Sequence, residues 1–144
     1  MIKLRTFYIF RIRDEFYSLY KDNPNSLYSV LKRLYHMKKN DLNLGFNLYN
    51  QLIERIDKTK LDRKIYIRYH REFVYSKNGN DHVINNLYKD EVSILNIKHA
   101  YILINTNKNY SSFFSVISVL GKEYFICDFS NNDYFWIKDI KILV

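Results

Sequence analysis

Cysteine, proline and glycine are scarce in this chain of 144 residues, which contains one, one and three of them. A lone cysteine has no partner for a disulfide within the chain, which is typical of a reducing compartment and predicts a cytoplasmic protein. Cys127 lies in the apolar run YFICDF, where we expect a buried, unreactive thiol. So few glycines and prolines indicate no flexible linker, and residues 1–144 are predicted to form a single domain.

Long apolar runs and catalytic motifs are also missing. No stretch approaches 18 uninterrupted apolar residues, so no membrane-spanning helix is expected, and the charged N-terminal segment is not typical of a signal peptide. The chain has no GxSxG elbow, no glycine-rich phosphate loop and no closely spaced histidine or cysteine ligands. We therefore expect a protein that is not an enzyme, with no cofactor, no metal, no membrane and no small-molecule substrate.

Basic residues are abundant, with 23 lysines and arginines against 15 acidic residues and a net charge of +8. Such a charge suits nucleic acid or an acidic protein partner. The densest basic stretch, KTKLDRKIYIRYHR at residues 58–71, interleaves cations with tyrosines in a way that suits phosphates and bases. The alternative is a solvated helix face with its tyrosines packed inward. No known RNA- or DNA-binding motif supports the first interpretation, so we keep a nucleic-acid-binding module as the alternative function and expect no direct nucleic-acid binding.

Two carboxylates near the C-terminus, Asp128 and Asp133, are the remaining candidates for chemistry. Paired carboxylates can hold a metal or transfer protons, as in a small nuclease. Aspartate and asparagine after a strand are also ordinary turn formers. We favour the turn over the carboxylate site.

The first strand is predicted over residues 4–12, where apolar side chains alternate between the two faces. Tyr8, Phe10 and Ile12 point one way, and Phe7, Ile9 and Arg11 point the other. Because both faces are mostly apolar, we expect this strand at the centre of a sheet that is covered on both sides.

Four helical segments are predicted to follow. Asp14 is expected to cap a short helix from Glu15 to about Tyr20, and Pro24 lies in the first turn of the next helix. Asp41 is expected to cap a third helix, and residues 58 to about 69 form a fourth. The apolar stripe of the second helix is Leu27, Val30, Leu31, Leu34 and Tyr35, and that of the third is Leu44, Leu48, Leu52 and Ile53.

The second half of the chain is predicted to be rich in strands. Asn78-Gly79 marks one hairpin, and a second is expected to turn near Lys98. The segment NYSSFFSVISVLG is predicted as a helix that Gly121 ends, followed by the buried strand EYFICDF and an aromatic tail. This order predicts an α/β (α+β) domain with a mixed or antiparallel sheet of about five strands, its helices lying mainly between the first strand and the strand-rich half.

Both ends of the chain resemble the sporulation inhibitor of replication family, SirA. The family begins with an aromatic strand and an acidic, aromatic helix start, here FYIFRIRDEFYSLY. It ends with Asp-Phe after a buried strand and then Tyr-x-Trp, here Asp128, Phe129, Tyr134 and Trp136. The helical segments NSLYSVLKRLY and GFNLYNQLIERI also occupy the expected place, whereas residues 57–100 show no match.

The resemblance implies a non-enzymatic protein, monomeric before binding, that binds the N-terminal domain (domain I) of the replication initiator DnaA. Such binding would lower the occupancy of the origin by the initiator and block new rounds of replication. By position, Phe16 and Tyr20 match the first-helix aromatics that dock on the initiator, and Tyr17 lies beside them.

A later helix completes the implied contact surface, where Tyr49, Gln51 and Leu52 are the candidates, although the sequence departs there from the family pattern. From the residues alone, Phe16 and Tyr20 share one helix face, and we expect Leu19 to turn toward the sheet. The residues leave open whether these two aromatics belong to the core or are presented to a partner.

Overall fold

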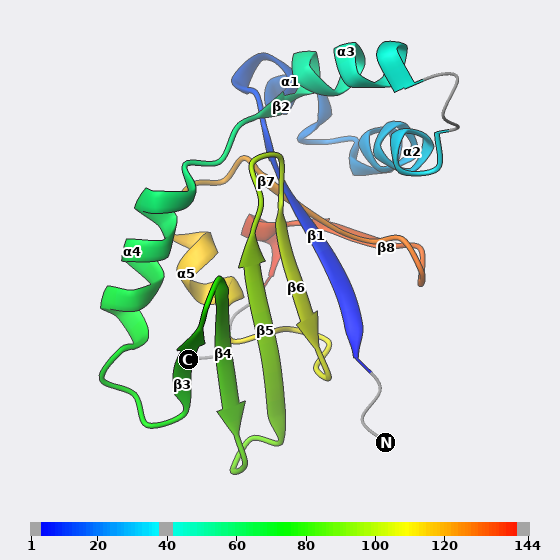
Figure 1. Cartoon of the computed structure of the whole chain (residues 1–144). Helices are drawn as coiled ribbons and strands as arrows, with labels where there is room; N and C mark the ends of the chain where they lie inside the picture. Colours follow the sequence, from blue (N-terminus) through cyan, green and yellow to red (C-terminus); the bar gives the residue numbers. More distant parts are fainter. Residues whose placement is uncertain (1–3, 38–41, 141–144) are drawn as a thin grey trace.

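Strand β1 (Arg5–Ile12) lies inside an antiparallel sheet, as its two apolar faces predict (Figure 1). The computed structural model describes residues 4–37 and 42–140, apart from the side chains of residues 42–44 and 46. In this part of the chain eight strands pair in the order β3-β4-β5-β6-β1-β7-β8, and β2 pairs with the end of β1. All the recorded pairings are antiparallel, so the sheet is antiparallel and not mixed.

The remaining elements follow the predicted order of helices, strands, helix and strands. The strands are β2 (Ile53–Glu54), β3 (Tyr75–Asn78), β4 (Asp81–Asn86), β5 (Glu91–Ile97), β6 (Ile102–Thr106), β7 (Tyr124–Asp128) and β8 (Asp133–Trp136). The helices are α1 (Asp14–Tyr20), α2 (Pro24–Tyr35), α3 (Leu42–Leu52), α4 (Lys58–Tyr69) and α5 (Phe114–Ser118), with a 3-10 turn at Ile137–Asp139. None of the described helices is long and apolar enough to cross a membrane.

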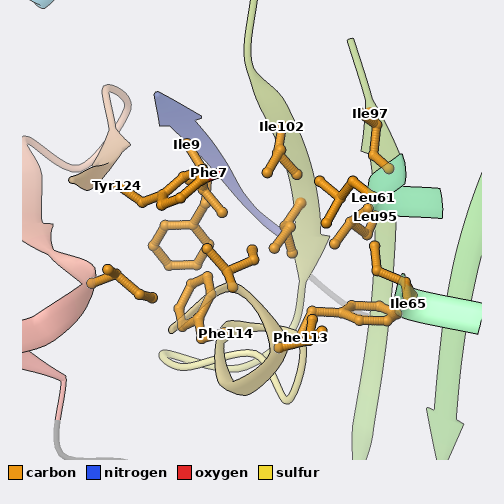
Figure 2. Packing of buried hydrophobic residues seen from close by; sticks show 14 of the residues in the cluster. Phe7, Ile9, Leu61, Ile65, Leu95, Ile97, Ile102, Phe113, Phe114 and Tyr124 are labelled. Atoms are coloured by element: carbon orange, nitrogen blue, oxygen red, sulfur yellow. The ribbon is translucent and has the colours of Figure 1, made fainter. Parts of the chain in front are cut away.

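Each face of the sheet carries its own hydrophobic core. On one face, Phe7 and Ile9 of β1 pack with the buried sides of α4 and α5, including Ile65 and Phe114 (Figure 2). On the other face, Phe10 and Ile12 pack with buried residues of α1, α2 and α3. Alternation along one strand therefore joins two layers of helices to a single sheet.

The sheet has more strands than the sequence predicted, eight against about five. Strand β2 has only two residues and continues directly from α3, so Ile53 fits the helical period although it pairs with Ile12 of β1. Strand β8 lies in the predicted aromatic tail, where its residues pair with β7. Short strands of this kind depend on an available sheet edge, which the local pattern does not reveal.

The two predicted hairpins are confirmed, whereas two predicted helix ends are wrong. Gly79 adopts a φ of 61° in the β3–β4 turn, and the backbone N–H of Lys98 donates to Tyr101 between β5 and β6. Asp14 is the first residue of α1 rather than its cap, and α5 ends at Ser118, before Gly121. The predicted capping residue Asp41 and the side chain of Leu44 lie outside the described residues.

Asp128 and Asp133 hold one arginine between them. Arg5 donates from Nε to Asp128 and from Nη2 to Asp133, each at 2.9 Å. The side chain of Asp128 also accepts from the backbone N–H of Asn131, in the turn before β8. These bonds join the start of β1 to the β7–β8 hairpin, so both carboxylates have the structural role that the turn interpretation predicts.

A buried histidine connects α4 to the β3–β4 hairpin. His82 is fully buried, with Nε2 at 2.7 Å from Oδ1 of Asp62 and Nδ1 at 2.7 Å from the hydroxyl of Tyr75. Burial lowers the pKa of His82 despite the nearby carboxylate. Burial alone would raise the pKa of Asp62, but hydrogen bonds from Lys58 and His82 outweigh it and lower that pKa. A neutral imidazole that donates to Asp62 and accepts from Tyr75 satisfies all three groups.

We expect acidification to destabilise the fold through His82. Its pKa in the folded chain lies below the ordinary value of 6.5, so below about pH 6.5 the unfolded chain binds a proton that the folded chain does not. Urea denaturation between pH 7.5 and 5.5 should show the free energy of unfolding falling with pH. The decline should disappear in His82→Gln and persist in His70→Gln, whose side chain is exposed. An equal decline in both variants would contradict this assignment.

Candidate functional site

Helix α1 begins directly after β1, and its position depends on that strand. The backbone N–H of Ile12 donates to Glu123, and the N–H of Arg13 donates to Leu52 at the end of α3. The side chain of Arg13 adds a bond from Nε to the carbonyl of Asn50 at 3.0 Å and an ion pair with Glu54 at 3.2 Å. One arginine thus connects the start of α1 with the end of α3, at the end of the molecule shown at the top of Figure 1.

Tyr17 is the residue of α1 that turns into the core. Its side chain is buried, with its ring edge-to-face against Trp136 and the two centroids 4.9 Å apart. The amino groups of Lys122 and Lys138 lie 5.5 and 5.7 Å from the centre of the same ring. Tyr17 therefore fastens the short helix to the C-terminal part of the sheet, and in the free chain it presents little surface to a partner.

The exposed side of α1 carries Leu19 together with the polar residues Asp14, Glu15 and Ser18. Leu19 is 65% exposed, so the prediction that it turns toward the sheet is wrong. Phe16 and Tyr20 pack against the edge of the core and remain partly exposed. The helix consequently offers three neighbouring apolar side chains, two of them anchored at their base by the core.

On α3, two of the three predicted contact residues reach the surface. Gln51 is exposed and Tyr49 is partly exposed, whereas Leu52 is buried in the core with Phe10 and Ile12. The hydroxyl of Tyr49 donates to the carbonyl of Ala100 at 2.7 Å, and burial raises the pKa of this tyrosine. Tyr49 is therefore held firmly and un-ionised at neutral pH.

A shallow hollow of about 340 Å³ lies beside Tyr49. It is lined by Tyr49, Asn50, Ile53, Arg55, His99 and Ala100. The described exposed residues of α3 next to it are uncharged: Asn47, Leu48 and Gln51. Apart from Arg55 on its lining, the hollow is bordered by uncharged and partly apolar side chains, and such a composition resembles the centre of protein interfaces, where arginine is enriched and other charged residues are depleted.

The family model described as "Sporulation inhibitor of replication protein SirA" matches residues 5–141. This chain belongs to the SirA family. The match covers both cores and also residues 57–100, the region in which the sequence motifs showed no resemblance. Comparison with the curated proteins gives no match.

Membership of the SirA family assigns a role as a sporulation inhibitor of replication. Two of the motif residues that resemble the SirA family also stabilise the fold. Trp136 packs on Tyr17, and Phe129 stacks on Tyr35 with the ring centroids 4.5 Å apart. The aromatic residues near the two ends of this chain therefore pack together beneath α1 and α2.

Leu19 and Leu48 are exposed in this SirA-family chain although the sequence patterns placed neither at the contact surface. Leu48 is 43% exposed on α3, although the helical stripe placed it with the core residues. The sequence did contain a signal for an exposed apolar residue on α1. Four of the five residues from Phe16 to Tyr20 are apolar, which is more than one face of a short helix can bury.

Replacing Tyr17 should separate its structural role from that of Leu19. Tyr17→Ala is expected to lower the free energy of unfolding by about 3 kcal/mol, because it empties a buried aromatic site. Leu19→Ala should change stability by less than about 0.5 kcal/mol, since it truncates an exposed side chain. Urea denaturation of both variants measures the difference, and similar losses would show that Leu19 is packed in solution.

Proposed function

We propose that this SirA-family chain inhibits replication by binding domain I of the initiator DnaA through the outer surfaces of α1 and α3. The contact surface consists of Phe16, Leu19, Tyr20, Leu48, Tyr49 and Gln51. The protein acts as a single domain in the cytoplasm, is monomeric before binding, and forms a one-to-one complex without catalysis. Tyr17 and Leu52, selected from the resemblance, support this surface from below.

The observation that carries this proposal is the exposure of Leu19 beside the partly exposed aromatics Phe16 and Tyr20. Large apolar side chains on a short, tethered helix lose little conformational freedom when a partner covers them. Aromatic anchors near the centre of an interface commonly contribute about 2 kcal/mol or more each. The surface of α1 thus has the composition of an interface hot spot.

The bond network beneath the surface supports the same proposal. Arg13 joins α1 to α3, and the hydroxyl of Tyr49 joins α3 to the β5–β6 turn. The two halves of the surface are therefore held in fixed positions before a partner arrives. A preorganised surface can inhibit a partner simply by covering the partner's own binding surface, and no catalysis is needed.

Titration calorimetry with purified domain I of the host initiator tests the proposal. We expect one-to-one binding, and Phe16→Ala and Tyr20→Ala should each weaken it by about thirtyfold, the equivalent of about 2 kcal/mol. Leu19→Glu should weaken it at least as much, because it places a charge in the centre of the interface.

Tyr88→Ala is the matched control, because Tyr88 is a fully exposed aromatic on the β4–β5 turn. It should bind like the unmodified chain. Thermal melts of all four variants verify folding. Unchanged affinity in all three α1 variants, with folding intact, would overturn the assignment of the interface.

A further inference from the structure

The outer face of α4 carries five cations. Lys60, Arg63, Lys64 and Arg68 lie on the helix and Arg71 follows its end, and all five side chains are exposed. At about 100° per residue they fall within roughly 140° of the helix circumference. The opposite side of α4 is buried on the sheet through Leu61, Ile65 and Tyr69.

These cations lack the acidic partners that other basic residues of the chain have. The strand arginines Arg5 and Arg11 form ion pairs with carboxylates. Among the described residues, none of the five α4 cations has a carboxylate within 4.0 Å. The local charge is therefore not neutralised within the chain.

The acidic residues of the segment are engaged at other positions. Asp57 caps α4 by accepting from the backbone N–H of Lys60. Asp62 faces inward, where it pairs with Lys58 and His82. The exposed carboxylates of the segment, Asp57 and Glu72, lie before the first turn of α4 and after its end. Most of the outer face thus has one sign of charge.

We propose that this face of α4 binds duplex DNA by contacting its phosphates, without reading sequence. Lys60, Lys64 and Arg68 repeat every four residues, so they form a row of cations about 12 Å long. A regular line of phosphates matches such a row, and release of counterions from the DNA drives the association. The alternative for residues 58–71, a solvated helix face with its tyrosines packed inward, is right for Tyr69, which is buried, and wrong for Tyr66, which is 51% exposed.

The composition of the face favours DNA over an acidic protein. Ile67 is 62% exposed and Tyr66 is 51% exposed, but Tyr66 already stacks on His70 with the centroids 4.9 Å apart. Phe73, which is fully exposed, lies beyond the end of the helix. On α4 itself, Ile67 and Tyr66 among the cations form a small apolar area compared with the centre of a protein interface, where charged residues are depleted. Phosphate recognition needs no such centre.

The DNA-binding face is separate from the proposed partner surface. Helix α4 belongs to the core on one side of the sheet, and α1, α2 and α3 belong to the core on the other side. Figure 1 shows α4 on the flank of the sheet, away from α2 and α3. The inference therefore rests on its own observations and is tested with the full chain and no initiator present.

Fluorescence anisotropy with a labelled duplex of about 20 base pairs, at 50 to 200 mM salt, tests this inference. We expect micromolar dissociation constants at low salt. If all five cations contact phosphates, the logarithm of the association constant should fall with the logarithm of the salt concentration with a slope of about −4.5. Combined Lys60→Gln, Arg63→Gln and Lys64→Gln should reduce the slope to about −2 and weaken low-salt binding at least about tenfold.

The matched control replaces three exposed lysines on separate turns and strands, with Lys77→Gln, Lys89→Gln and Lys98→Gln. It removes the same charge and should keep the slope of the unmodified chain. Three results would overturn the inference: no binding of the chain to duplex at 50 mM salt, equal losses in the two triple variants, or tighter binding of the chain to polyglutamate than to the duplex. Circular dichroism confirms that both variants fold.

Discussion

The structure depends on β1 being buried on both faces at once. Phe7 and Ile9 belong to one core, and Phe10 and Ile12 belong to the other. The same strand forms ladders with β6 and β7 and ends where β2 and α1 begin. A polar residue at any of these four positions would leave a cavity or an unpaired group in one core and would also displace the neighbouring strands. The helices on the two faces are therefore not independent of each other.

Much of this fold was predictable from the sequence, and the predictions that failed share a physical cause. The two-sided strand, the amphipathic α2 and the Asn78-Gly79 hairpin are specified by local patterns, and the structure confirms them, except that Tyr35 of the predicted α2 stripe is 50% exposed and Tyr28 is buried. Helix α1 has only seven residues, too few for the period to decide whether Tyr17 or Leu19 faces the sheet. Which of the two residues is buried depends on the contact with Trp136, which is distant in sequence, and on the residue at which β1 ends. Strand β8 was missed for the same reason, since it is defined by its pairing with β7.

The candidate site was only partly predictable because burial of its residues is a tertiary property. Family position selected Phe16, Tyr20 and Tyr49, and the structure leaves these at least partly exposed. Position alone could not separate them from Tyr17 and Leu52, which are adjacent in sequence but buried. If the register of such a short helix shifts by one residue, a different side chain faces the sheet and a different one faces the solvent.

A seven-residue helix would not be stable by itself, because nucleation is costly and few hydrogen bonds repay it. Here α1 is held by side-chain contacts outside its own backbone: Tyr17 packs on Trp136, and Arg13 donates to the carbonyl of Asn50. These contacts reduce the conformational entropy that a partner would otherwise have to remove on binding. Under the proposed function, buried residues beneath α1 would contribute to affinity without touching the partner. This separation also explains why the aromatic motifs at the two ends of the chain belong together: the C-terminal motif supplies Trp136, on which the N-terminal helix rests.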